Sequence, residues 1–218
     1  MRILVTGATG LVGQGVLREC LLDPAVTHVV ALGRHASGQS HDKLEDVVVE
    51  DFSQLGPVEP RLQSLDACLY CAGAPPVGTP ETEYRHVTLD LTLAVANTLG
   101  RLNPDLVFVY VSGAFSDASS RIMPLRVKGE TEQALAALPI RTVMLRTGGV
   151  RPVEGVRSPH AAMAALYAVG APLMGICMRL MPGLVTTTQH VGRAMLQLAR
   201  QASPPAIVEN AEINRLGA

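Results

Sequence analysis

Three glycines at intervals of three residues follow a short apolar run near the start of the chain. The run at 2–6 predicts a strand, and the pattern at 13–22 predicts a helix. Between them Gly7, Gly10 and Gly13 permit a tight turn and a close approach of the backbone to a ligand. A helix N-terminus placed after such a turn offers free N–H donors and a favourable dipole, so the segment predicts a pyrophosphate-binding loop. A purely structural glycine turn is the alternative.

Short β-branched runs then alternate with helical patterns as far as Gly148, which is typical of parallel βαβ units. The expected strands cover residues 29–32, 47–49, 67–71, 106–111 and 142–145, and the expected helices cover residues 82–102 and 127–138. The sequence therefore predicts an α/β protein with a doubly wound parallel sheet of the Rossmann type.

The alternation fails beyond Gly148. We expect a loop at 151–159, an apolar helical stretch at 160–181, and a last helix at 189–201 with Thr188 as its N-cap. Residues 206–208 read as a final edge strand. The prediction is a single domain over residues 1–218, in which residues 149–218 supply a small helical C-terminal cap facing the substrate and the last helices.

Composition narrows the class of partner. The chain is 48% hydrophobic and 17% charged, with a formal net charge of −1, so nothing favours nucleic acid as a partner. A small-molecule substrate of apolar or mixed character is expected. Only Cys68 and Cys71 have a suggestive spacing, but they lie in a run that reads as a buried strand, which favours two core residues over a redox or zinc pair. The six histidines are scattered without metal-binding spacing and the first residues already read as a strand, so we expect a cytoplasmic protein with no metal site.

Several motifs together resemble those of the short-chain dehydrogenase/reductase superfamily, in particular its extended and atypical branches. The glycine spacing Gly-x-x-Gly-x-x-Gly is one of them. The others lie at the ends of the later strands and at the start of the helix after the fifth strand, and they are Asp51-Phe52, Cys71-Ala72-Gly73, Ser112, Lys128-Gly129-Glu130 and the strand and turn Val143 to Gly148. The resemblance covers most of the chain and includes bacterial proteins labelled as epimerases or NAD(P)-binding proteins by fold.

The resemblance implies a set of cofactor and active-site residues. The loop would hold the dinucleotide through Gly7, Thr9, Gly10, Leu11 and Val12. Asp51 and Phe52 would contact the adenine, and Cys71, Ala72 and Gly73 would let the ribose approach. Ser112 and Lys128 would occupy the places of the active-site Ser and Lys of the family; Ser112 would orient the reacting group and Lys128 would hold the nicotinamide ribose.

Arg34 bears on the choice of cofactor. It follows Gly33 at the end of the second predicted strand, where NAD-preferring proteins commonly place an acid for the ribose 2′-hydroxyl. A guanidinium instead suits a 2′-phosphate, and His35 can add a second donor. The sequence thus favours NADP, with NAD as the second choice; Arg34 stacking on the adenine is the alternative.

Position 124 departs from the family pattern. The family's proton-donating Tyr stands four residues before the Lys, and here Pro124 occupies that place. Thr147 also replaces a usual Pro. Two functions stay open: an NADP(H)-dependent oxidoreductase-like or epimerase-like enzyme, or a non-catalytic NADP(H)-binding sensor or assembly protein. In an enzyme, the proton would come from water or from an unassigned side chain, for which the candidates are Tyr84, His86, His160 and Tyr167.

Residues 161–178 carry no charge, which raises the question of a membrane span. The run is rich in Ala and is interrupted by Gly170, Pro172 and Gly175, so we expect two short helices that cover the substrate or form a homodimer rather than a span. Nearby arginines leave peripheral contact with an anionic membrane surface open.

Overall fold

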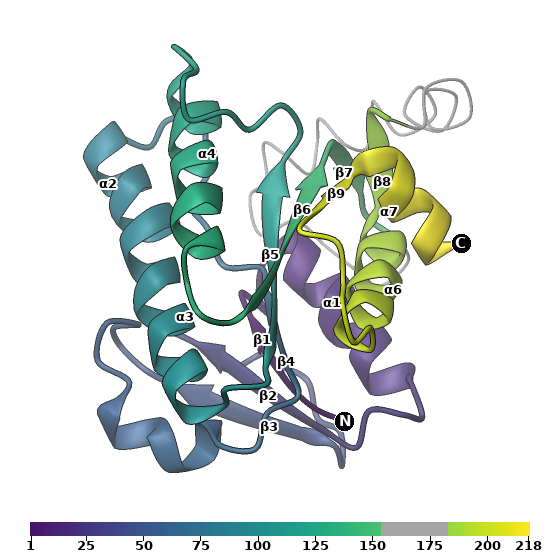
Figure 1. The fold of residues 1–218 in the computed structure, drawn as a ribbon. Coiled ribbons are helices and arrows are strands. Elements are labelled where there is room, and N and C mark those ends of the chain that lie inside the picture. Colours follow the sequence, from purple (N-terminus) through teal and green to yellow (C-terminus); the bar gives the residue numbers. More distant parts are fainter. Residues whose placement is uncertain (154–182) are drawn as a thin grey trace.

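The computed structural model describes residues 1–153 and 183–218, which form a parallel sheet covered by helices on both faces (Figure 1). The strands are β1 (Arg2–Thr6), β2 (His28–Gly33), β3 (Leu44–Val48), β4 (Ala67–Tyr70), β5 (Val107–Gly113), β6 (Arg141–Thr147), β7 (Gly149–Arg151), β8 (Val185–Thr187) and β9 (Ile207–Glu209). The helices are α1 (Leu11–Leu22), a 3-10 helix (Gly56–Leu62), α2 (Glu81–Arg85), a π-helical turn (His86–Asp90), α3 (Leu91–Leu102), α4 (Met123–Ala136), α6 (Thr188–Ala199) and α7 (Asn210–Gly217).

Seven strands form the main sheet in the order β3-β2-β1-β4-β5-β6-β9, and each neighbouring pair is parallel. The chain begins at the centre of the sheet and winds outward in both directions, so the predicted doubly wound parallel sheet is confirmed. Alternate residues of the central strands are buried on opposite faces; Ile3 and Leu4, for example, belong to different apolar clusters. Such burial on both faces explains why these strands read as continuous apolar runs.

The two helical layers are separate in Figure 1. Helices α2, α3 and α4 cover one face of the sheet, while α1, α6 and α7 cover the other. Glycines bring α1 and α6 close together: a Cβ at Gly15 would lie 2.4 Å from the Cβ of Thr188, and one at Gly192 would lie 2.9 Å from the Cγ of Glu19. The C-terminal segment is therefore packed directly against the helix that follows the glycine loop.

Most element boundaries agree with the sequence prediction, including the edge strand β9. The predicted helix at 82–102 is interrupted by the π-helical turn between α2 and α3. The N-cap of α6 is Thr187 rather than Thr188, since the Thr187 hydroxyl accepts a hydrogen bond from the His190 backbone N–H at 3.0 Å. Helix α4 starts at Met123, earlier than predicted, because Pro is tolerated in the first turn of a helix.

The expected loop at 151–159 and apolar helices at 160–181 lie almost wholly outside the described residues. What is described of 149–218 includes two elements of the main fold, β9 at the sheet edge and α6 on α1. A short parallel pair, β7 with β8, was not predicted.

Candidate functional site

The glycine loop joins β1 to α1 at the carboxyl edge of the sheet. Gly7 has a φ of +67°, and a Cβ at this position would lie 2.7 Å from the backbone carbonyl of Cys71. A Cβ at Gly13 would lie 2.0 Å from the carbonyl oxygen of Gly7. Gly10 caps α1 without a side-chain hydrogen bond, so the first N–H groups of the helix keep their capacity to bind an anion. The loop therefore has the tight turn and the helix N-terminus that are typical of diphosphate-binding loops.

Thr6 fixes the position of the neighbouring strand end. Its buried hydroxyl accepts hydrogen bonds from the backbone N–H groups of Cys71 at 3.0 Å and Ala72 at 3.1 Å. The turn after β4 is thereby held against the glycine loop. Cys68 is buried and Cys71 is partly buried, both as free thiols.

A cleft of about 530 Å³ opens along this edge, within the usual size range of ligand pockets. Nine of the expected cofactor residues line it: Gly7, Thr9, Gly10, Arg34, Asp51, Phe52, Cys71, Ala72 and Gly73. Four predicted site residues are not among its lining residues, namely Leu11, Val12, Ser112 and Lys128. The structure thus brings the glycine loop and the ends of β2 and β4 together with the segment after β3.

Arg34 lies exposed at one end of the cleft, beside His35. Within residues 1–153 and 183–218 it makes no hydrogen bond or ion pair. Asp51, in contrast, accepts a hydrogen bond from the backbone N–H of Ser53 at 2.8 Å, which lowers the pKa of its carboxyl. An uncommitted guanidinium in a cleft next to a diphosphate loop is suited to a further phosphate group.

One wall of the cleft escaped the sequence analysis as a binding surface. It consists of Glu83, His86, Val87 and Leu91, from α2, the π-helical turn and the start of α3. The spacing of 83, 87 and 91 was a usable signal, because residues four apart share a helix face. Val87 and Leu91 also fit the apolar face of the single helix that the sequence predicts over residues 82–102.

Ser112 ends up in a buried polar network at the end of β5. It is fully buried, and its hydroxyl donates a hydrogen bond to Glu132 of α4 at 2.6 Å. Glu132 also accepts from the Arg146 guanidinium at 2.6 Å, and Arg146 in turn reaches Glu209 at 3.1 Å. These carboxylates raise the pKa of Arg146. The network joins β5, α4, β6 and β9, which gives Ser112 a structural role in this geometry. To orient a substrate as predicted, the Ser112 hydroxyl would have to give up its hydrogen bond to Glu132 and form one to the substrate.

Lys128 lies in the second turn of α4, not in the first as the sequence predicted. Its ammonium reaches the carbonyl oxygen of Val111 in β5 at 3.4 Å. Burial lowers the pKa of Lys128 to about 8, against the opposing effect of Glu132. The side chain is thus partly buried against the end of β5.

The position of the missing phenol is in the first turn of the same helix, where Pro124 stands. Of the four alternative proton donors, Tyr84 is buried, and burial raises the pKa of its phenol. His86 is exposed in the cleft wall, with its Nδ1 3.4 Å from Asp90. His160 and Tyr167 lie outside the described residues.

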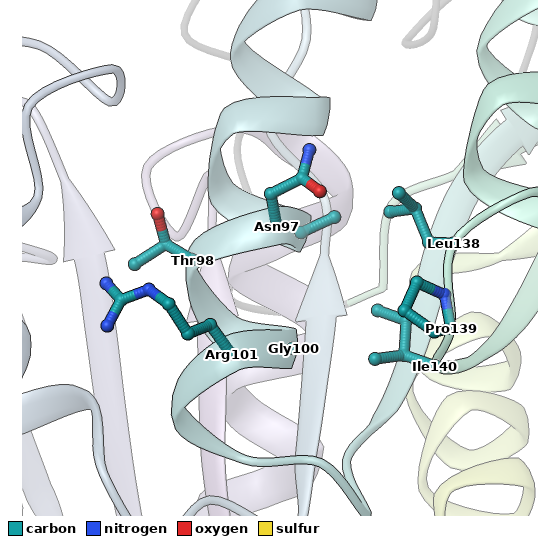
Figure 2. Close-up of a pocket in the computed structure, with 8 residues that line it drawn as sticks. Asn97, Thr98, Gly100, Arg101, Leu138, Pro139 and Ile140 are labelled. Carbon is teal, nitrogen blue, oxygen red and sulfur yellow. The ribbon is translucent and has the colours of Figure 1, made fainter.

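A second hollow of about 440 Å³ lies at the opposite, amino end of the sheet, between α3 and the turn that precedes β6 (Figure 2). Figure 2 shows Arg101 extending away from Leu138 and Ile140. Arg101 is paired with Glu59, and no carboxylate or imidazole lines the hollow. It is therefore separate from the cleft beside the glycine loop.

Within the described ranges, no cluster of His, Cys, Asp and Glu side chains could hold a metal ion. In the same ranges no helix has the length and apolar character needed to cross a membrane. The uncharged run at 161–178 is not part of these ranges.

The parallel sheet, the glycine loop and the cleft beside it define a nicotinamide-dinucleotide-binding protein of the Rossmann class. Residues 3–135 match the model of the NAD dependent epimerase/dehydratase family. The chain belongs to this family, as the resemblance to extended and atypical short-chain dehydrogenases/reductases implied.

The chain is also similar to curated fungal proteins. It is 30% identical over 175 residues to "Protein fmp52, mitochondrial" of Emericella nidulans, covering 76% of this chain and 74% of the relative. It is 32% identical over 162 residues to "Protein FMP52, mitochondrial" of Saccharomyces cerevisiae, covering 72% and 68%. Both relatives are named mitochondrial, so the cytoplasmic localisation predicted from the sequence is wrong.

Solved structures share the fold at low identity. The Bordetella bronchiseptica enzyme WbmF in complex with NAD+ has a TM-score of 0.68 and 14% identity, over 98% of this chain and 76% of that one. UDP-glucuronic acid 4-epimerase from Bacillus cereus in complex with NAD has a TM-score of 0.67 and 17% identity, over 96% and 78%. At these identities the similarity supports the fold alone.

Proposed function

We propose that this chain is an NADP(H)-binding oxidoreductase of the atypical short-chain dehydrogenase/reductase type, acting on a small apolar or mixed substrate. Family membership accounts for a nicotinamide cofactor. The observation that carries the choice of NADP is Arg34, a cation in the cleft that forms no ion pair with the described residues. A ribose 2′-phosphate supplies the charge that this guanidinium lacks.

The residues present fit the cofactor. The N–H groups at the start of α1 would hold the diphosphate. Gly7 lies close to the turn after β4 and has no side chain there, which leaves room for the diphosphate. Asp51 and Phe52 would face the adenine, and Cys71 to Gly73 the ribose. When bound, the nicotinamide would give or accept a hydride. Lys128 would hold the nicotinamide ribose from the neighbouring strand end.

Calorimetry with NADPH and NADH at fixed ionic strength tests the proposal. The wild-type protein should bind NADPH more tightly, and Arg34→Ala should remove most of the difference, a loss of about 1–3 kcal/mol or roughly 5- to 150-fold in Kd. Arg215→Ala is the matched control, because Arg215 is an exposed arginine of α7 that pairs with Glu212 away from the cleft. Equal affinity of the wild-type protein for both cofactors would refute the assignment.

Pro124 supports a second candidate, a non-catalytic NADP(H)-binding sensor or assembly protein. A proline has no ionisable group where the family places its proton donor. Oxidation of NADPH with a panel of carbonyls, enones and quinones separates the two: turnover of any member favours the enzyme, and tight binding without turnover favours the sensor.

Homodimer formation and peripheral membrane contact remain part of the proposal on the basis of the sequence at 160–181. Sedimentation of the purified protein, alone and with anionic vesicles, tests both.

A further inference from the structure

Lys128 occupies an unusual place for a cation. Its Nζ lies 3.4 Å from the carbonyl oxygen of Val111, and its side chain passes over Gly113, the last residue of β5. Strand β5 is the neighbour of β4, whose end lines the cofactor cleft. The ammonium therefore lies at the carboxyl edge of the sheet, where open α/β sheets bind their ligands.

The choice of a lysine here is itself informative. The chain has 18 lysine and arginine residues, of which Lys43 and Lys128 are the two lysines. Lys43 is engaged with the backbone carbonyls of Leu21 and Asp23, at 3.3 and 2.9 Å. Arginine stays charged at any accessible pH, whereas a buried lysine can lose a proton. Lys128 is thus the lysine at the carboxyl edge of the sheet, and unlike an arginine it can release a proton.

No carboxylate pairs directly with Lys128 among the described residues. The charged group that acts on the pKa of Lys128 is Glu132, one turn further along α4, and its oxygens are already engaged by Ser112 and by Arg146 of β6. From β5 the ammonium faces only the backbone carbonyl of Val111 and Gly113. An ammonium has three N–H donors, so two remain for a bound ligand.

We propose that Lys128 is the proton donor of this site. The inference rests on the proposed function: bound NADPH would supply a hydride to the carbon of a carbonyl substrate and become NADP⁺, and the carbonyl oxygen takes a proton from the Lys128 ammonium. The C=O π bond breaks, one C–H and one O–H bond form, and the neutral amine regains its proton from water. Holding the ribose and donating the proton use different N–H groups of one side chain.

The acidity of Lys128 is appropriate for this role. With a pKa of about 8, the side chain is mostly protonated at neutral pH and gives up its proton more readily than an ordinary lysine. General acid–base catalysis works best when the pKa of the acid lies near the operating pH. Carbonyl reduction should therefore decline as the pH rises through about 8.

Lys128→Arg separates proton donation from ribose binding. The arginine keeps the charge and the donors but cannot release a proton in this pH range. We expect NADPH affinity within about fivefold of wild type, a loss of roughly 10²- to 10⁴-fold in carbonyl reduction, and no alkaline decline in what activity remains. Hydride transfer to a quinone, for which no protein proton donor is needed, should fall by no more than the change in NADPH affinity accounts for. Lys128→Met should weaken NADPH binding as well.

The outcomes distinguish this inference from the proposed function. Carbonyl reduction by Lys128→Arg within a few-fold of wild type, with an unchanged pH profile, would overturn the role of Lys128 alone. So would a wild-type protein that binds NADPH and reduces quinones but no carbonyl. Failure of the wild-type protein to bind NADPH would overturn the proposed function.

A measurement on the wild-type protein needs no turnover. Reductive ¹³C-methylation labels the amines of Met1, Lys43 and Lys128, and the signal absent from Lys128→Arg is that of Lys128. We expect this signal to titrate near pH 8 and its titration to move when NADP⁺ is added. Titration above pH 10 without a response to NADP⁺ would contradict a role at the site.

Discussion

Replacing Glu132 with glutamine should destabilise the whole fold, because this carboxylate connects strands from distant parts of the chain. Glu132 is 6% exposed and accepts hydrogen bonds from the Ser112 hydroxyl and from the Arg146 guanidinium, each at 2.6 Å. A glutamine oxygen can keep the bond to Ser112, but its NH₂ group then faces the guanidinium. The variant leaves Arg146 with Glu209 as its remaining charged partner.

The size of the effect follows from this geometry. Breaking a buried ion pair costs about 3–5 kcal/mol, and the partial exposure of Arg146, whose side chain is 22% exposed, reduces the penalty. We expect the free energy of unfolding to fall by about 2–4 kcal/mol, since hydrogen bonds to charged groups contribute about 1.5–3 kcal/mol. For a protein of this size the loss corresponds to a decrease in Tm of roughly 4–16 °C.

Urea unfolding at neutral pH, followed by circular dichroism, measures this loss. The matched control is Glu81→Gln, which removes a carboxylate that also pairs with an arginine, Arg126, but is 49% exposed. The control should lose less than about 1 kcal/mol, as exposed ion pairs generally do. A loss for Glu132→Gln no larger than that of the control would refute the structural role of the network.

Four other changes test separate features. Gly13→Ala should abolish cofactor binding, seen by calorimetry, because its Cβ would lie 2.0 Å from a carbonyl oxygen of the glycine loop. Ser112→Ala should lower the free energy of unfolding by about 1–3 kcal/mol, because it removes a buried hydrogen bond, and the affinity for NADPH should stay within about twofold of wild type. A loss of NADPH affinity without a loss of stability would instead place Ser112 in the binding site. Thr187→Ala should cost about 0.5–2 kcal/mol in urea unfolding, since it removes the N-cap of α6. Burial raises the pKa of Glu45, but hydrogen bonding to Arg61 lowers it overall. The free energy of unfolding that this carboxylate contributes at neutral pH should therefore fall as the pH drops below about 4.5. Urea unfolding of Glu45→Gln should show a smaller decrease over the same pH range.

The sheet, the glycine loop and Arg34 were predictable because the sequence patterns that indicate them are local. A buried parallel strand is an unbroken apolar run, and the glycine loop places its constraints within seven consecutive residues, Gly7 to Gly13. Arg34 was identifiable for the same reason, since it directly follows a strand. Each of these features depends on neighbours in the sequence.

The rest of the site depends on contacts between distant residues. Ser112 and Arg146 meet at Glu132, and Arg146 reaches Glu209, only after β5, β6 and β9 have paired. No local pattern states that Ser112 points at a buried carboxylate instead of the cleft. The pKa of Lys128 likewise results from burial against β5, and a sequence alone does not reveal which cations the fold removes from water.

The contact between α1 and α6 has a consequence for where this protein can be divided. The family match ends at residue 135, yet Gly15 and Gly192 hold the first helix against a helix that begins at Thr188. A chain truncated after residue 148 would lose β9 and α6 and expose the apolar side of α1, including Val16 and Leu17. The end of the family match is therefore not a folding boundary, and the fragment that carries every residue of the glycine loop should aggregate rather than bind a nucleotide.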